Sequence, residues 1–135
     1  MIAESIMCAL TLWFEARGEP LAGKMAVAST YVNRAAIHRT TIRKQLLRPA
    51  QYSCWNSFSG KHRILKEYNS GKIHGPAWEE CKKVSNMIYD KTLPKTSFTH
   101  YYNPKKVKKD SEAWEWIKGL KNKKQIGNHI FGSCK

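Results

Sequence analysis

The N-terminal stretch of the chain is apolar around nearly the whole circumference of the helix that it predicts. Its apolar residues recur at helical spacing and also fill the neighbouring faces: Ile2, Ile6, Met7, Ala9, Leu10, Leu12, Trp13 and Phe14. A helix that is apolar all round is buried inside a protein. We therefore expect this helix to be largely buried and to end near Arg17.

A second helix is predicted directly after the first. Gly18 suits the C-terminal cap of one helix, and Pro20 suits the first turn of the next. The expected second helix covers about residues 20–36 and carries small residues that permit close contact between helices: Ala22, Gly23, Ala26 and Ser29.

The middle of the chain predicts short elements. Thr41 is expected to cap a short helix through Leu47, which Pro49 ends. Residues 51–60 are expected to form a loop, and residues 64–68 another helical turn or two.

The C-terminal half predicts two more helices and little strand. Pro76 opens a helix through about residue 88, whereas residues 93–103 lack a helical period and are expected to be extended or looped. A helix capped by Asp110 or Ser111 is expected to carry Trp114, Ile117 and Leu120, and the tail 127–135 is expected to be irregular.

Length and composition predict one folded domain over residues 1–135. Apolar residues make up 41% of the chain, which is too rich for disorder, and neither an internal repeat nor a linker divides it. The expected fold class is therefore mainly α, in a single domain. Residues 2–14 lack a basic leading region and a cleavage site, so we do not expect a signal peptide, and no transmembrane segment is predicted.

The formal net charge of +14 favours association with polyanions such as nucleic acid, anionic lipid, lipopolysaccharide or cell-wall polymers. A basic surface that merely aids solubility is the plainer alternative. Lysines gather at 105–109 and 121–124, but no phosphate-loop, zinc-finger or RNA-recognition pattern accompanies them. A dedicated nucleic-acid fold is therefore not predicted.

The four cysteines, Cys8, Cys54, Cys81 and Cys134, are widely spaced and are not accompanied by paired histidines. This spacing does not predict a zinc site, and we expect no metal and no cofactor. Three fully paired disulfide connectivities and four free thiols all remain open.

Glu15 is the candidate for acid catalysis, because it ends an otherwise apolar helix. Partial burial raises the pKa of a carboxyl group, so that the group can hold a proton and donate it to a leaving oxygen. Glycosidic cleavage needs such an acid. The alternative interpretation is an ion pair between Glu15 and Arg17 at the helix end.

Other polar and aromatic residues are of the kinds that bind sugars. They are Asn33, Arg34, Tyr101, Tyr102, Asn103 and His129. Each also has a structural interpretation: the tyrosines can be core residues with a polar tip, and Asn103 before Pro104 can begin a turn. Glu19 before Pro20 can interact with the dipole at the N-terminus of a helix.

Several segments together resemble the SleB-type cell-wall hydrolases, a family known from spore cortex-lytic enzymes and phage endolysins. The first block runs from Glu15-Ala16-Arg17-Gly18-Glu19-Pro20 through Gly23 and residues 26–28 to Asn33-Arg34. The later blocks follow in the order of the family: residues 51–55, 99–104 and 126–131. These ordered matches span nearly the whole chain.

The resemblance implies a compact lysozyme-like, mostly helical domain that is related to lytic transglycosylases. Such an enzyme acts on the β-1,4 bond from N-acetylmuramic acid to N-acetylglucosamine in bacterial peptidoglycan. Carried over by position, Glu15 is the general acid and then the general base. Glu19, Tyr101, Tyr102 and Asn103 are carried over as substrate-binding or supporting residues.

The resemblance also leaves alternatives. A hydrolytic muramidase would use Glu15 with a second carboxylate such as Glu19, and a more distant alternative is a basic nucleic-acid-binding module. A phage endolysin fits a chain without an export signal, made in the host cytoplasm and released to the periplasm by a holin. We expect it to be a monomer, with anionic wall polymers or lipopolysaccharide as further partners.

Overall fold

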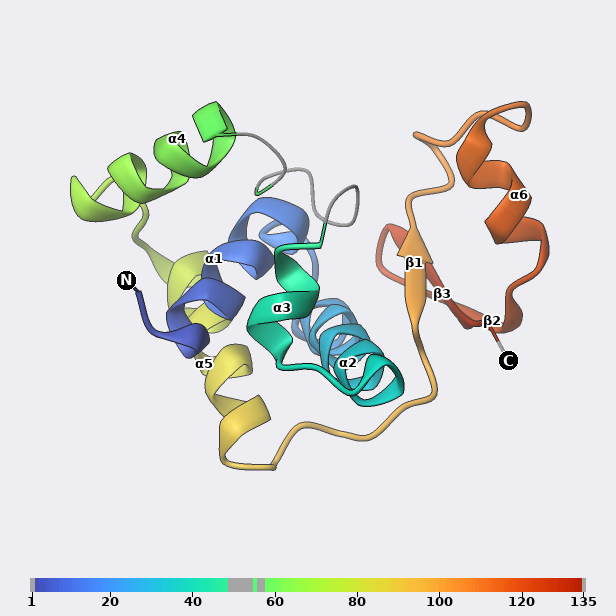
Figure 1. The fold of residues 1–135 in the computed structure, drawn as a ribbon, viewed down its shortest axis with the longest axis horizontal. Helices are drawn as coiled ribbons and strands as arrows, with labels where there is room; N and C mark the ends of the chain where they lie inside the picture. The colour runs from blue at the N-terminus through green and yellow to red at the C-terminus, as the bar shows by residue number, and fades with distance from the viewer. Residues whose placement is uncertain (1, 49–54, 56–57, 135) are drawn as a thin grey trace.

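The computed structural model describes residues 2–48, 55 and 58–134. Helices come first along the chain, and a small sheet with one helix follows (Figure 1). The elements are α1 (Glu4–Ala16), α2 (Leu21–His38), α3 (Ile42–Leu46), α4 (Phe58–Asn69), α5 (Pro76–Tyr89), β1 (His100–Tyr102), α6 (Glu112–Lys118), β2 (Lys121–Ile126) and β3 (His129–Ser133).

Helix α1 lies among the other helices, as its all-round apolar character predicts (Figure 1). It packs against α2, α3 and α5, and every residue from Met7 to Leu12 is buried. One of these residues is polar: Thr11 donates its hydroxyl to the Met7 carbonyl and accepts a hydrogen bond from the Trp55 indole, with O···O and N···O distances of 2.8 Å. The central helix is thereby joined to Trp55.

The helix boundaries follow local chemistry in most places. Helix α1 ends at Ala16, and α2 begins right after Pro20. Thr41 caps α3 by accepting a hydrogen bond from the Lys44 amide at 3.1 Å, as predicted. Pro76 occupies the first turn of α5, where its missing N–H is not needed.

Two predicted boundaries were wrong. Helix α4 begins at Phe58 and runs for 12 residues, although a loop was expected up to residue 60 and only a turn or two after it. Helix α6 ends at Lys118, before Leu120. Ser111 stands at its N-cap position but donates its hydroxyl back to the Lys108 carbonyl at 2.6 Å instead of capping the helix.

The prediction of an irregular tail from Gly127 was also wrong, because residues 129–133 form the central strand of an antiparallel sheet ordered β1-β3-β2. Gly127 and Asn128 make a two-residue turn between paired Ile126 and His129, and Gly127 has a φ of 61°. A Gly-Asn pair between strands is a known hairpin signal. Strand β3 lacks the usual alternation of buried and exposed residues because it is covered on both faces.

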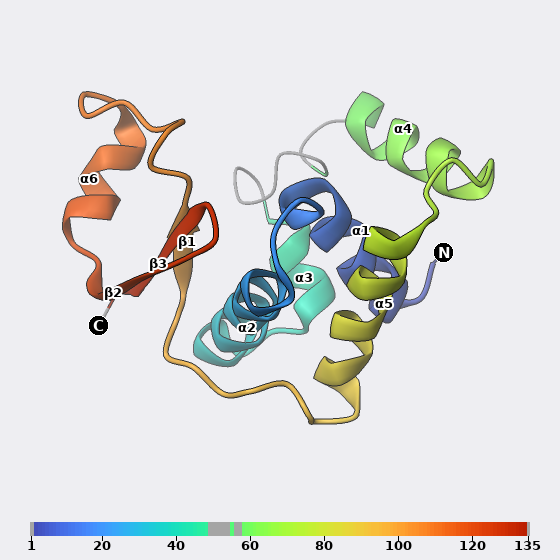
Figure 2. The same ribbon diagram turned by 180° about the vertical axis from the view of Figure 1, so that it is seen from behind.

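The sheet and α6 lie to one side of the helices, and a long segment after α5 leads to them (Figures 1 and 2). Asn33 of α2 fixes this segment by donating its side-chain amide to the carbonyls of Thr96 and Phe98, at 2.9 and 2.7 Å. Helix α2 also contacts β1 and β2. The core continues across this junction, since fully buried Phe131 of β3 belongs to the same apolar cluster as α1.

Candidate active site

Glu15 lies in the last turn of α1, where the central helix reaches the edge of the core. Its side chain is half-buried. Burial raises the pKa of the Glu15 carboxyl above its usual range, because removal of water disfavours the charged form. The group can therefore keep a proton at a higher pH than an exposed glutamate does, as a general acid requires.

Tyr101 reaches Glu15 from strand β1. Its hydroxyl donates a hydrogen bond to Oε1 of Glu15 at 3.0 Å, across 86 positions of sequence. This bond favours the ionised carboxylate and so lowers the pKa of Glu15, but its effect is smaller than that of burial. The two causes of the shift are thus opposed, and neither is a neighbouring carboxylate.

The ring of Tyr101 is held by aromatic neighbours on one face of the sheet. Phe131 stands directly opposite it in the β1–β3 ladder, with ring centroids 5.7 Å apart. His129 lies two residues before Phe131 and therefore points to the same face, with its ring centroid 5.1 Å from that of Tyr101. These contacts fix the direction of the Tyr101 hydroxyl.

Glu19 lies between α1 and α2, and its side chain contacts the β2–β3 turn. The residue is buried, its Oε1 accepts a hydrogen bond from the Asn128 amide at 2.8 Å, and its Oε2 accepts one from the Asn128 side chain at 2.9 Å. Its carbonyl oxygen accepts a bond from Nζ of Lys24 at 2.7 Å. Glu19 thereby ties the helices to the turn that carries His129.

His129 connects the Glu19 contact to Tyr101. Its Nδ1 lies 3.4 Å from Oε1 of Glu19 without making a hydrogen bond. Burial lowers the pKa of the imidazole; Glu19 opposes this shift, and Lys106 adds to it. Burial prevails, so the ring is neutral near neutral pH and supports Tyr101 as a packing group.

Tyr102 and Asn103 are not brought to Glu15. Successive residues of a strand point to opposite faces, and Tyr102 accordingly contacts Trp116 of α6, with ring centroids 6.4 Å apart. Asn103 makes the turn that its position before Pro104 predicts: its Oδ1 accepts a hydrogen bond from the Lys105 amide at 3.0 Å. The structure thus brings together Glu15 and Tyr101, and Glu19 lies next to His129, which contacts Tyr101.

Two supporting residues were missed by the sequence analysis. Lys24 is 3% exposed, and besides holding the Glu19 carbonyl it pairs with Oε1 of Glu80 at 2.9 Å. Asn128 supplies both donors to the Glu19 carboxylate. Lys24 lies among the small residues of α2, and its role could not be predicted from the sequence, because only the packing of α5 against α2 brings Glu80 to it. Asn128 could have been found from the Gly-Asn hairpin signal.

Within the described residues, no group of three or more His, Cys, Asp or Glu side chains could hold a metal ion. Cys8, Cys81 and Cys134 are free thiols, of which Cys134 is exposed. Burial raises the pKa of both Cys8 and Cys81 to about 11, so these two thiols are inert. Cys54 and residues 51–53 of the family block lie outside the described residues.

Comparison with known proteins assigns the family. Residues 18–132 match the model of the cell wall hydrolase family, and the chain therefore belongs to that family. In fold it is similar to the catalytic domain of the germination-specific lytic transglycosylase SleB from Bacillus anthracis, with a TM-score of 0.66 and 23% identity. The similarity covers 98% of this chain and 97% of that one. None of the curated proteins matches the chain significantly in sequence.

These findings confirm the predicted mainly helical, lysozyme-like fold and the prediction of an enzyme that degrades bacterial peptidoglycan. The resemblance to SleB-type cell-wall hydrolases is confirmed as well. Among the described residues, no helix is both long enough and apolar enough to cross a membrane.

Proposed function

We propose that the chain cleaves the β-1,4 bond between N-acetylmuramic acid and N-acetylglucosamine as a lytic transglycosylase, with Glu15 as both general acid and general base. One observation carries this proposal: a half-buried carboxyl with a raised pKa accepts a hydrogen bond from Tyr101 on the facing sheet. That arrangement suits an acid that must first give a proton and later take one back.

The Tyr101 contact assigns different tasks to the two oxygens of Glu15. Because Oε1 accepts the Tyr101 hydroxyl, the proton to be donated resides on Oε2. Oε2 protonates the glycosidic oxygen while the bond from that oxygen to C1 of muramic acid breaks. The carboxylate left behind keeps its hydrogen bond from Tyr101, which stabilises the charge.

The second step returns the proton. The Glu15 carboxylate takes it from the 6-hydroxyl of the same muramic acid, and the oxygen of that hydroxyl bonds to C1. A 1,6-anhydro ring forms, and Glu15 is again protonated. Water does not take part, so a single carboxyl group suffices.

A hydrolase that uses Glu19 as a second carboxylate is the alternative. Two observations count against it: both carboxylate oxygens of Glu19 accept hydrogen bonds from Asn128, and no carboxylate of the described chain contributes to the pKa shift of Glu15. A carboxylate close to Glu15 would raise that pKa by charge repulsion.

Muropeptide analysis by mass spectrometry distinguishes the two reactions. The transglycosylase leaves 1,6-anhydromuramic ends, which are lighter by one water than the reducing ends that a hydrolase leaves. We expect anhydro products from the wild type and none from Glu15→Gln. Reducing ends from the wild type would overturn the transglycosylase proposal and retain Glu15 as a hydrolytic acid. Activity in a folded Glu15→Gln variant would overturn its catalytic role.

Of the residues expected to bind the glycan, Tyr101 is the best placed, because its ring lines the face of the sheet that meets Glu15. Glu19 is proposed to act through the turn that it holds. Tyr102 packs on Trp116, and Asn103 forms a turn. These two residues would therefore contact sugar only away from Glu15, on the face of β1 opposite to Tyr101.

We also propose that the chain is an endolysin, on the basis of the sequence blocks that it shares with that group. It would be made in the host cytoplasm and reach the wall through a holin, and it would act as a monomer. Production in bacteria with and without a holin tests this role: rapid lysis should require both proteins and an intact Glu15.

Anionic wall polymers or lipopolysaccharide are the proposed partners of the basic surface. Exposed lysines on β2, an edge strand, support this proposal: Lys121, Lys123 and Lys124. Lysines on an edge strand also prevent pairing with other chains. Binding to purified sacculi should weaken as salt rises, and unchanged binding would overturn the proposal.

The alternative of a nucleic-acid-binding module fails if the wild type clears a peptidoglycan suspension and folded Glu15→Gln does not.

A further inference from the structure

A basic hollow lies beside the end of α1 that carries Glu15. It has a volume of about 490 Å³ and is lined by Trp13, Phe14, Arg17, Arg63, Glu67, Lys72 and Ile73. Residues of α1, α4 and the α4–α5 connection thus meet here. Three cations against one carboxylate make the hollow positive, which favours an anionic ligand.

Two arginines of the hollow are stacked on its aromatic rings. The guanidinium of Arg17 lies 5.0 Å from the ring centroid of Trp13, and that of Arg63 lies 5.9 Å from the ring centroid of Phe14. A guanidinium that lies over an aromatic ring can still donate its N–H groups, and two of them match a carboxylate with two parallel hydrogen bonds.

The arginines are not already neutralised by the protein. Within the described chain, neither Arg17 nor Arg63 forms an ion pair with a carboxylate, although Glu67 lines the same hollow. Both side chains are exposed. A ligand with carboxylates can therefore reach two guanidinium groups, while Glu67 offers a partner for an ammonium group.

The hollow and Glu15 lie on different sides of the same helix end. At about 100° per residue, Glu15 is turned by about 160° from both Trp13 and Arg17 around the helix axis. A helix with its side chains is about 10 Å wide. The path of about 160° around a helix of about 5 Å radius is about 14 Å long. An extended peptide of four or five residues, at about 3.3–3.6 Å per residue, spans this path.

We propose that this hollow binds the acidic peptide stem of the muramic acid whose glycosidic bond Glu15 cleaves. The inference rests on the proposed function, because that function brings a peptide-bearing sugar to Glu15. The stem combines several carboxylates with an amino group on its diamino acid, and this combination complements Arg17, Arg63 and Lys72 together with Glu67. Stem contacts then help to select peptide-bearing glycan as substrate.

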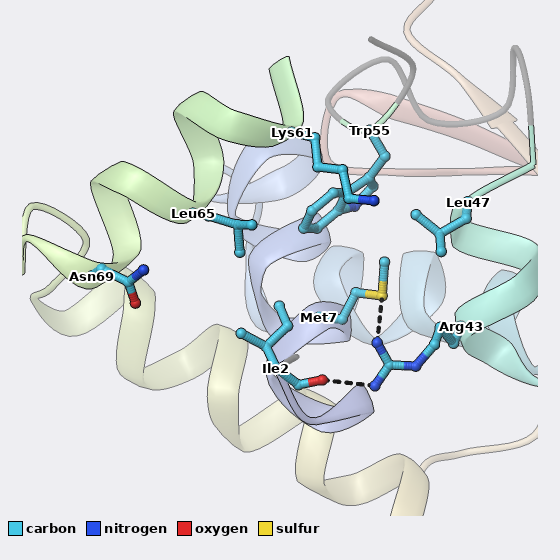
Figure 3. Close-up of a pocket in the computed structure, with 8 residues that line it drawn as sticks. All are labelled: Ile2, Met7, Arg43, Leu47, Trp55, Lys61, Leu65 and Asn69. Carbon is cyan, nitrogen blue, oxygen red and sulfur yellow. Dashed lines mark hydrogen bonds between the residues drawn. The ribbon is translucent and has the colours of Figure 1, made fainter. Parts of the chain in front are cut away.

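A second hollow supplies the control. It has a volume of about 520 Å³, and its lining is mainly apolar, with Met7, Leu47, Trp55 and Leu65 (Figure 3). Lys61 borders this second hollow, two residues before Arg63 on α4, and is also exposed. Lys61→Gln therefore removes the same charge from the same helix outside the proposed stem site.

Kinetics on two substrates test the proposal with the full chain. One substrate is peptidoglycan with its stems, and the other is the same glycan after an amidase has removed them. For Arg63→Gln we expect KM to rise roughly tenfold on the first substrate with kcat unchanged, the size of one lost charge-assisted hydrogen bond. Neither constant should change on the second substrate. Arg17→Gln should behave alike, and Lys61→Gln should match the wild type on both.

Equal effects of Arg63→Gln on both substrates would overturn the proposal and indicate that the hollow binds sugar. A wild type that cleaves both substrates with the same KM would overturn stem recognition and leave the proposed function intact. If the wild type cleaves neither, the proposed function fails by itself. Titration of a synthetic stem tetrapeptide into the Glu15→Gln protein still decides the binding site, because binding should weaken on adding Arg63→Gln but not Lys61→Gln.

Discussion

Gly127 in the β2–β3 turn is the position at which a single added methyl group should break the contact between Glu19 and this turn. It has a φ of 61°, and a Cβ there would lie 2.5 Å from Oε1 of Glu19 and 3.0 Å from Cδ of Pro20. Alanine in the left-handed region costs about 1–2 kcal/mol. Moving Oε1 also breaks its charge-assisted bond from Asn128, worth about 1.5–3 kcal/mol. Gly127→Ala should therefore destabilise the fold by about 2.5–5 kcal/mol.

Gly71→Ala is the matched control. Gly71 has a φ of 77°, but a Cβ there would meet nothing within 4 Å, so only the backbone cost applies. Chemical unfolding of both variants measures the difference, which we expect to be about 1.5–3 kcal/mol. In thermal unfolding this difference corresponds to Gly127→Ala melting on the order of 5–15 °C below Gly71→Ala.

Glu19 identifies the cause of any such difference. In a Glu19→Ala background, most of the extra cost of Gly127→Ala over Gly71→Ala should disappear, because the clashing oxygen is gone and only the 3.0 Å contact with Cδ of Pro20 remains. Gly127→Ala should also reduce peptidoglycan cleavage more than Gly71→Ala, since the turn carries His129 against Tyr101. If the two glycine variants prove equally stable, Oε1 of Glu19 does not occupy the position beside Gly127 that the structure gives it.

Three further predictions concern protons and the site. Glu15→Gln should abolish cleavage and raise the free energy of unfolding. Because burial raises the pKa of Glu15 in the folded chain, the wild type loses stability as pH rises through that pKa. The difference in unfolding free energy between Glu15→Gln and the wild type should therefore widen with pH, and a difference independent of pH contradicts this. Tyr101→Phe should slow cleavage roughly tenfold and move the alkaline limb of the pH–rate profile to higher pH, because the lost hydrogen bond no longer lowers the pKa of Glu15. An unchanged profile would show that the bond is unimportant. Burial, helped by the charges of Arg34 and His38, lowers the pKa of His100 to about 4, so folding stability should fall as pH drops from about 6.5 towards 4. Denaturant midpoints measured across that range should show a smaller fall for His100→Asn, and an equal fall would assign the acid sensitivity to other groups.

The helical half of the fold was readable from the sequence because its signals are local. An apolar circumference identifies a buried helix, and Pro20, Thr41 and Pro76 mark helix starts by their own backbone or side-chain chemistry. The sheet was read less well. Strand β3 is covered on both faces and shows no alternation, so its Gly-Asn turn was the remaining local signal.

The candidate acid was found because burial at a helix end leaves a trace in the sequence, namely a glutamate that terminates an apolar stretch. Its hydrogen-bond partner was named only as one of a group. Tyr101 and Tyr102 are chemically identical neighbours, and the strand pleat alone sends one to Glu15 and the other to Trp116.

The buried first helix, the position of Glu15 at its end and the family blocks around it could all be read from the order of residues. The role of each polar group in those blocks depends on the folded arrangement. This arrangement directs the Glu19 carboxylate to a turn 109 residues away and brings a buried lysine of α2 to its carbonyl. These contacts depend on how the helices and the sheet pack, and the spacing of residues along a chain carries no record of partners so distant.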